Sequence, residues 1–129
     1  MKRIFRTRTF SRWARKVGLP DSALGHAVSE MERGLIDADL GGSVVKKRVP
    51  LAGRGKRGGA RTLVATQFND RWFFIYGFAK NERANLTANE LRVLQEVAKD
   101  LLAFNDTDLA IAVSQGELVE IDHDEENRS

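Results

Sequence analysis

The spacing of apolar residues predicts two short helices near the N-terminus. Residues 2–7 (KRIFRT) are typical of a short strand. In residues 9–18, four apolar side chains recur at the spacing of one helical face: Phe10, Trp13, Ala14 and Val17. A second helix with an apolar face is predicted in residues 21–34. Asp21 and Ser22 are its N-cap candidates, and Gly34 marks the end of the helix. The pattern therefore predicts a strand followed by a helical hairpin.

The middle of the chain carries three segments with strand character. They are residues 44–49, 60–68 and 71–79, and the turn residues Asn69 and Asp70 separate the last two. The short turn predicts an antiparallel pair. Residues 71–79 (RWFFIYGFA) are apolar on both faces, which favours a central strand. Simple alternation places Tyr76 with Trp72, Phe74 and Phe78, so we expect it in the core, with base stacking as the alternative.

A third helix is predicted in residues 85–102 by a capping box, in which Thr87 and Glu90 satisfy each other's backbone N–H groups. A short helix within residues 105–116, capped by Asn105 or Asp106, and a strand at 117–121 complete the pattern. The predicted class is α+β, with a small antiparallel meander packed against an N-terminal helical hairpin and a C-terminal helix. We expect one domain over residues 1–121 and a flexible acidic tail at 122–129.

Composition narrows the function classes. The 129 residues are 42% hydrophobic and 30% charged, a balance typical of soluble globular domains. The absence of cysteine excludes disulfide scaffolds, thiolate catalysis and cysteine zinc sites, and two histidines argue against a histidine-rich metal site. No apolar run is long enough to cross a bilayer, and the basic N-terminus lacks the apolar region of a secretory signal. We therefore expect a cytoplasmic protein without a membrane partner.

The net charge of +3 conceals a strong asymmetry. Residues 1–61 contain 15 Lys and Arg against 5 Asp and Glu, whereas residues 62–129 contain 6 against 13. Positive charge gathered in one half of a chain indicates an anionic partner, of which nucleic acid is favoured over a membrane. A merely solvated basic surface is the alternative.

The stretch GRGKRGGAR, residues 53–61, matches G-x-G-x-x-G, but no helix is predicted after it, as a dinucleotide site requires. A Walker loop would need Ser or Thr after Lys56. We interpret the stretch as a flexible connection between two strands that carries basic side chains. Seven basic and no acidic residues lie between positions 46 and 61, and they are candidates for phosphate contacts: Lys46, Lys47, Arg48, Arg54, Lys56, Arg57 and Arg61.

Residues 55–91 resemble the RelE/ParE superfamily of bacterial toxins, and most closely the HigB-type, RelE-like toxins of type II toxin–antitoxin modules. The segments GKRGGAR at residues 55–61 and FAKNERANL at 78–86 carry the resemblance. The predicted order of elements agrees with a RelE-like fold over most of the chain. Residues from about 103 to 121 then correspond to a family-variable α–β extension.

The resemblance implies a toxin that cleaves mRNA in the ribosomal A site and is silenced by a cognate antitoxin, here expected to be a helix-turn-helix protein. It implies cleavage without a metal or cofactor, by attack of the ribose 2′-OH on the adjacent phosphate. Carried over by position, Arg61 is the phosphate clamp and Lys56 the candidate base, and Lys80 and Arg83 complete the catalytic set. The best-known relatives have arginine and tyrosine where this chain has Asn81 and Thr87.

Two other functions fit the same sequence. One is a ParE-like inhibitor of DNA gyrase, which acts by binding a protein. The other is a non-catalytic nucleic-acid-binding module that uses the basic segment alone. The paired basic segments at residues 55–61 and 78–86 favour the endonuclease.

Overall fold

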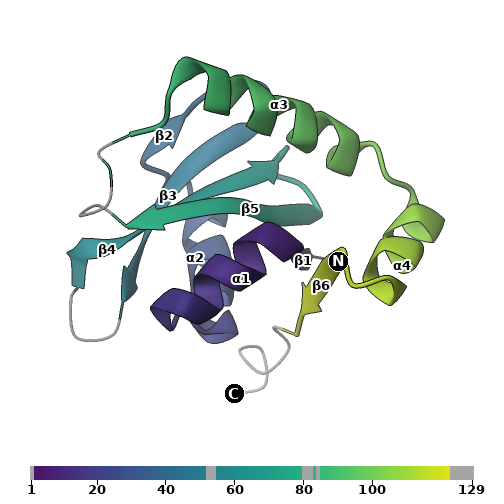
Figure 1. Cartoon of the computed structure of the whole chain (residues 1–129), viewed down its shortest axis with the longest axis horizontal. Coiled ribbons are helices and arrows are strands. Elements are labelled where there is room, and N and C mark those ends of the chain that lie inside the picture. The colour runs from purple at the N-terminus through teal and green to yellow at the C-terminus, as the bar shows by residue number, and fades with distance from the viewer. Residues whose placement is uncertain (1, 52–54, 80–82, 84, 123–129) are drawn as a thin grey trace.

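The computed structural model of the chain describes residues 2–51, 55–79, 83 and 85–122, and for residues 55–58 it describes the backbone alone. The strands are β1 (Arg3–Thr7), β2 (Ala38–Asp39), β3 (Val44–Leu51), β4 (Gly55–Thr66), β5 (Arg71–Ala79) and β6 (Leu118–Ile121). The helices are α1 (Arg8–Val17), α2 (Asp21–Glu32), α3 (Ala88–Leu102) and α4 (Asp106–Ser114). This order confirms the predicted α+β class, with the two-residue β2 as an unpredicted addition (Figure 1).

The six strands form one sheet in the order β2-β3-β4-β5-β1-β6. The run β3-β4-β5 is the predicted antiparallel meander. The first strand, β1, lies beyond β5, parallel to it, and pairs on its other side with the antiparallel strand β6. The pairing of β1 joins the two ends of the chain, and no local sequence pattern predicts such a contact.

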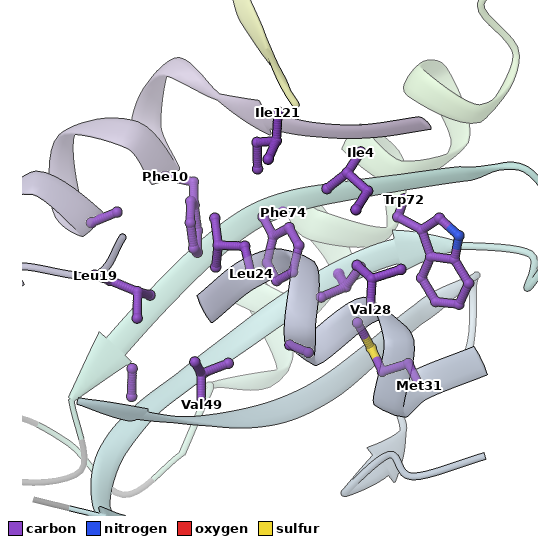
Figure 2. Close-up of a cluster of buried hydrophobic side chains, with 14 of the residues drawn as sticks. Ile4, Phe10, Leu19, Leu24, Val28, Met31, Val49, Trp72, Phe74 and Ile121 are labelled. Atoms are coloured by element: carbon purple, nitrogen blue, oxygen red, sulfur yellow. The ribbon is translucent and has the colours of Figure 1, made fainter. Parts of the chain in front are cut away.

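Helices cover both faces of the sheet. Helices α1 and α2 lie on one face and α3 runs across the other, as Figure 1 shows. Figure 2 shows the core under α1 and α2, where Phe10 and Leu24 meet Phe74 of the central strand. A second core under α3 and α4 includes the stacked pair Phe5–Phe73, whose ring centroids are 5.0 Å apart. Burial on both faces explains why β5 carries apolar side chains on both sides after Arg71.

Helix ends mostly follow the sequence signals. The predicted capping box at the start of α3 is present, with the Thr87 hydroxyl accepting from Glu90 N–H and the Glu90 carboxylate accepting from Thr87 N–H. Asn105 caps α4 in the same way. The prediction for α2 was wrong, because Pro20 takes the N-cap position and makes no side-chain cap bond. The Asp21 carboxylate instead accepts a hydrogen bond from Arg6 at 3.0 Å.

The glycine-rich stretch is largely strand, which corrects its interpretation as a flexible connection. β4 begins at Gly55, and its partner β3 has a register irregularity between Val49 and Leu51. At Gly59 an added Cβ would lie 2.4 Å from the Val49 carbonyl oxygen. Glycine therefore permits close approach of the two strands at this irregularity.

A β-bulge corrects the predicted place of Tyr76. Leu63 pairs with Tyr76 but the next residue, Val64, pairs with Phe74, so Ile75 is an extra residue on β5. Ile75 and Tyr76 consequently both point to the α3 side of the sheet, whereas Phe74 packs under α1. Simple alternation along the strand fails at such a position.

Candidate nucleic-acid interface

Basic and aromatic side chains gather on the α3 side of the sheet, where β3, β4 and β5 run side by side. Along these strands the paired rows are Lys46–Leu63–Tyr76 and Arg48–Arg61–Phe78. Leu63 and Phe78 belong to the core under α3, so the residues two positions away on the same strands share that face. We define the cationic face as Lys46, Arg61, Tyr76 and Phe78 together with Arg83, which follows β5.

Arg61 lies at the centre of the cationic face. In the sheet it pairs with Arg48 on β3 and with Phe78 on β5, and its side chain is half-buried. The one hydrogen bond of its guanidinium within the described residues is a long one, 3.4 Å from Nη1 to the Gly59 carbonyl oxygen. No carboxylate in the described part of the chain pairs with Arg61. Most of its donors are therefore available to an anion.

Arg48 stands directly opposite Arg61 but has an acidic partner. Its Nε donates to Asp37 at 2.9 Å and its backbone N–H to the same carboxylate at 2.6 Å. Burial raises the pKa of Asp37 and the hydrogen bonds from Arg48 lower it, with a net shift downward. Like charges opposite each other across strands are unfavourable, and Asp37 neutralises only one of this pair. The unbalanced charge remains at Arg61.

Lys46 and Lys47, both predicted to contact RNA, lie on opposite faces of the sheet. Lys46 is half-buried on the α3 side. Lys47 is 3% exposed on the other side, where its Nζ lies 2.8 Å from Glu30 and 2.8 Å from the Leu35 carbonyl oxygen. Because Lys47 is buried and ion-paired under α2, we leave it out of the candidate interface.

Arg83 is held in place by the first turn of α3. Its guanidinium makes a bidentate contact with the Glu90 carboxylate, in which Nη1 lies 2.7 Å from Oε2, and it sits 5.7 Å from the centroid of the Phe78 ring. The hydrogen bond from Arg83, with others from Thr87, lowers the pKa of Glu90 to about 2. The hydrogen bond to Glu90 is likewise the main reason that the pKa of Arg83 is raised. Arg83 is thus fixed at the rim of the cationic face by a carboxylate.

Tyr76 is half-buried beside these cations. Its ring centroid is 6.4 Å from that of Phe78, over whose ring the Arg83 guanidinium also lies. The predicted core contact is made in part, because Tyr76 packs against the core under α3 and not with Trp72 and Phe74 under α1, and a bulge has no clear signature in an apolar strand. A usable signal was the hydroxyl itself, since a tyrosine within a buried strand needs a polar partner for its O–H.

The other predicted site residues add no described side chain to the cationic face. Arg54 and Lys80 lie outside the described residues, as do the side chains of Lys56 and Arg57. His26 is 73% exposed on α2, and its Nε2 lies 3.7 Å from Glu30 on the far side of the sheet. Within the described ranges, no cluster of three or more His, Asp or Glu is arranged to hold a metal ion.

The arrangement suits an extended anion better than a small ligand. Lys46 and Arg61 lie on the neighbouring strands β3 and β4, with the Glu90-paired Arg83 at the rim, and strands in a sheet are about 4.8 Å apart. Such spacing places charges within reach of successive phosphates on one strand of nucleic acid. Tyr76 adds a half-buried aromatic ring to this face, packed against the buried Phe78. None of the helices in the described part of the chain is long and apolar enough to cross a membrane.

Comparison with known proteins identifies a matching family model. A comparison with curated proteins gives no significant match. The family model described as the RelE toxin of the RelE/RelB toxin–antitoxin system matches residues 2–121. This match spans every helix and strand of the fold, including α4 and β6. The chain therefore belongs to the RelE toxin family.

Proposed function

We propose that the protein is the toxin of a type II toxin–antitoxin module, of the HigB type, and that it cleaves mRNA in the ribosomal A site. The proposal rests mainly on the position and surroundings of Arg61. It is an arginine without a carboxylate partner among the described residues, at the centre of a cationic sheet face in a member of the RelE toxin family. In a metal-independent cleavage of a phosphodiester, such a group can stabilise the charge that develops on the scissile phosphate.

The proposed reaction is attack of the ribose 2′-OH on the adjacent phosphate without a metal ion. Charge builds up on the phosphorane oxygens, and the planar guanidinium of Arg61 matches two of them. Lys46 would bind a neighbouring phosphate from β3. Lys56 is retained as the candidate base, because a lysine crowded by other cations loses its proton more easily. Arg83 and Lys80 are kept as further catalytic candidates on the resemblance alone.

An antitoxin of the helix-turn-helix type is the proposed regulatory partner, in the cytoplasm. Its toxin-binding segment should be acidic or amphipathic, because covering Arg61 and Lys46 without compensating charge is costly. Binding should raise the toxin's melting temperature by mass action. A partner that co-purifies with the chain but leaves Lys46 and Arg61 accessible to chemical labelling would contradict masking of the cationic face.

A translation extract tests the proposed activity directly. The purified chain is added to an extract that translates a defined mRNA, and the cut sites are mapped to the codon. We expect cuts in step with codons that disappear when ribosomes are omitted. Double-strand breaks in DNA with purified gyrase, and no mRNA cuts, would replace this proposal by a gyrase inhibitor. Binding without either product would indicate a non-catalytic module.

A further inference from the structure

The proposed reaction requires a proton donor as well as a phosphate clamp. When the P–O5′ bond breaks, the leaving 5′ oxygen is a strongly basic alkoxide unless a proton reaches it. Arginine is a poor donor for this purpose, because it retains its proton at any ordinary pH. A general acid must therefore be sought among other groups on the cationic face.

The chain offers few groups of this kind. It contains no cysteine, one tyrosine and two histidines. His26 lies on α2, on the far side of the sheet from Arg61, and His123 is outside the described residues. Glu90 is ionised at neutral pH, since its pKa is about 2, and both of its oxygens are engaged by Arg83. Lys46 is assigned to a neighbouring phosphate and Lys56 to the base, so Tyr76 is the uncharged donor that the fold places on the same face as the clamp.

The β-bulge at Ile75 is what puts Tyr76 there. Without the extra residue, the ring would enter the core under α1 with Phe74. With it, Tyr76 pairs with Leu63 and lies diagonally across from Arg61, a relationship in which Cβ atoms are about 7–8 Å apart. Bulges that re-aim one side chain are common next to active sites. A phosphate held by Arg61 would then lie on the same face of the sheet as the Tyr76 ring.

The surroundings of the hydroxyl suit proton donation. Tyr76 is half-buried, so a substrate can reach it, and Phe78 fixes one side of its ring. Arg83 lies over the ring of the same Phe78, 5.7 Å from its centroid, and is itself anchored by Glu90. A fixed cation at this place stabilises the tyrosinate that forms when the proton leaves.

We infer that Tyr76 is the general acid of the cleavage reaction, donating its proton to the 5′ oxygen. The 2′ oxygen bonds to phosphorus as the P–O5′ bond breaks, and a base takes the 2′ proton. The products are a 2′,3′-cyclic phosphate and a 5′-hydroxyl that carries the tyrosine proton, and the tyrosinate recovers a proton from water. This inference rests on the proposed endonuclease function.

The test compares two leaving groups in single-turnover cleavage on programmed ribosomes. One mRNA is natural, and the other carries a 5′-bridging sulfur at the cut position, so that a thiolate leaves and needs no protonation. On natural mRNA, Tyr76→Phe should lower the rate about 10²–10⁴-fold, the usual contribution of a positioned acid. On the sulfur-substituted mRNA, the Tyr76→Phe variant should cleave at a rate within a few-fold of the wild-type rate. Base stacking would survive this substitution, because phenylalanine keeps the ring.

Arg61→Ala is the matched control, because loss of the phosphate clamp should slow cleavage of both mRNAs. A thermal melt of each variant monitors the fold. A second measurement needs no variant: the wild-type rate on natural mRNA should fall at alkaline pH, and this fall should vanish with the sulfur leaving group. Near-normal cleavage of natural mRNA by Tyr76→Phe, or an alkaline fall identical for both leaving groups, would overturn the inference alone. A wild-type chain that cuts neither mRNA would overturn the proposed function and this inference with it.

Discussion

The Nζ atom of Lys47 lies 2.8 Å from the Oε1 atom of Glu30, in a contact that joins β3 to α2 beneath the sheet. Lys47 is almost fully buried, and its second hydrogen bond goes to the Leu35 carbonyl oxygen. Its neighbour Lys46 points to the cationic face. Two adjacent lysines therefore serve different purposes, one in the fold and one in the candidate interface.

Lys47→Ala should strongly destabilise the protein. It removes a buried ion pair with Glu30 together with the hydrogen bond to the Leu35 carbonyl oxygen, and breaking a buried pair costs about 3–5 kcal/mol in the free energy of unfolding. The double variant Lys47→Met with Glu30→Leu should recover most of the loss, because it removes both charges. Urea denaturation measures all of these, with Lys46→Ala as a control expected to stay within about 0.5 kcal/mol of wild type. Equal stability of Lys47→Ala and Lys46→Ala would contradict a structural role for Lys47.

Lys46→Ala should instead change the salt dependence of RNA binding. Each phosphate contacted on a single strand contributes about −0.7 to the slope of log K against log salt concentration, so losing one contact should make the slope shallower by about that amount. Fluorescence anisotropy with a single-stranded RNA at several salt concentrations gives the slope. Lys16→Ala removes the same charge from an exposed position on α1, on the other side of the sheet, and should leave the slope nearly unchanged. The same change of slope in both variants would show that net charge, and not the cationic face, controls binding.

Arg61→Ala should lower the cleavage rate about 10²–10³-fold, the scale for removing one preorganised donor to a transition state. Arg61→Lys should recover only part of this loss, because an ammonium group cannot form the bidentate contact. Arg61 makes one long hydrogen bond within the described residues, so both variants should melt near the wild-type temperature. Lost cleavage together with a collapsed melting transition would make Arg61 a structural residue.

Gly77→Ala should destabilise the packing of α1 on β5. A Cβ atom at Gly77 would lie 2.2 Å from Cζ3 of the Trp13 ring, so the helix or the ring would have to move. Overpacking of this kind typically costs about 1–3 kcal/mol. In a Trp13→Ala background the same substitution should cost much less, and a double-mutant cycle measured by denaturation gives the coupling. Additive effects of the two substitutions would mean that the Trp13 ring is not the obstacle.

The contribution of Glu90 to stability should depend on pH in a defined direction. Its pKa is lowered to about 2 in the folded protein, so the contribution is fully present above the ordinary pKa of a glutamate and is lost as the pH falls toward 2. The melting temperatures of wild type and Glu90→Gln should therefore differ at neutral pH and converge between about pH 4.5 and 2. Glu96→Gln, an exposed change on the same helix, should follow wild type throughout. A difference between wild type and Glu90→Gln that is constant down to pH 2 would contradict the bond to Arg83.

Signals that act over a few residues determined much of this protein directly from the sequence. The apolar spacing in α1 gave its buried face, because side chains three and four apart share one side of a helix. The capping box of α3 needed only Thr87 and Glu90. The meander followed from strands separated by short turns. The charged segment around Arg61 was likewise visible before the fold, since it depends on composition alone.

The tertiary structure decided how these pieces face one another. The parallel place of β1 beside β5 depends on a contact between residues about 70 positions apart, for which the chain has no local marker. The separation of Lys46 from Lys47 depends on which side of β3 receives α2 and its Glu30. The transfer of Tyr76 to the cationic face depends on one extra residue in a strand that is apolar on both sides. A sequence gives the period of a strand, but a bulge changes the phase of that period, and only the pairing with the neighbouring strand fixes the phase.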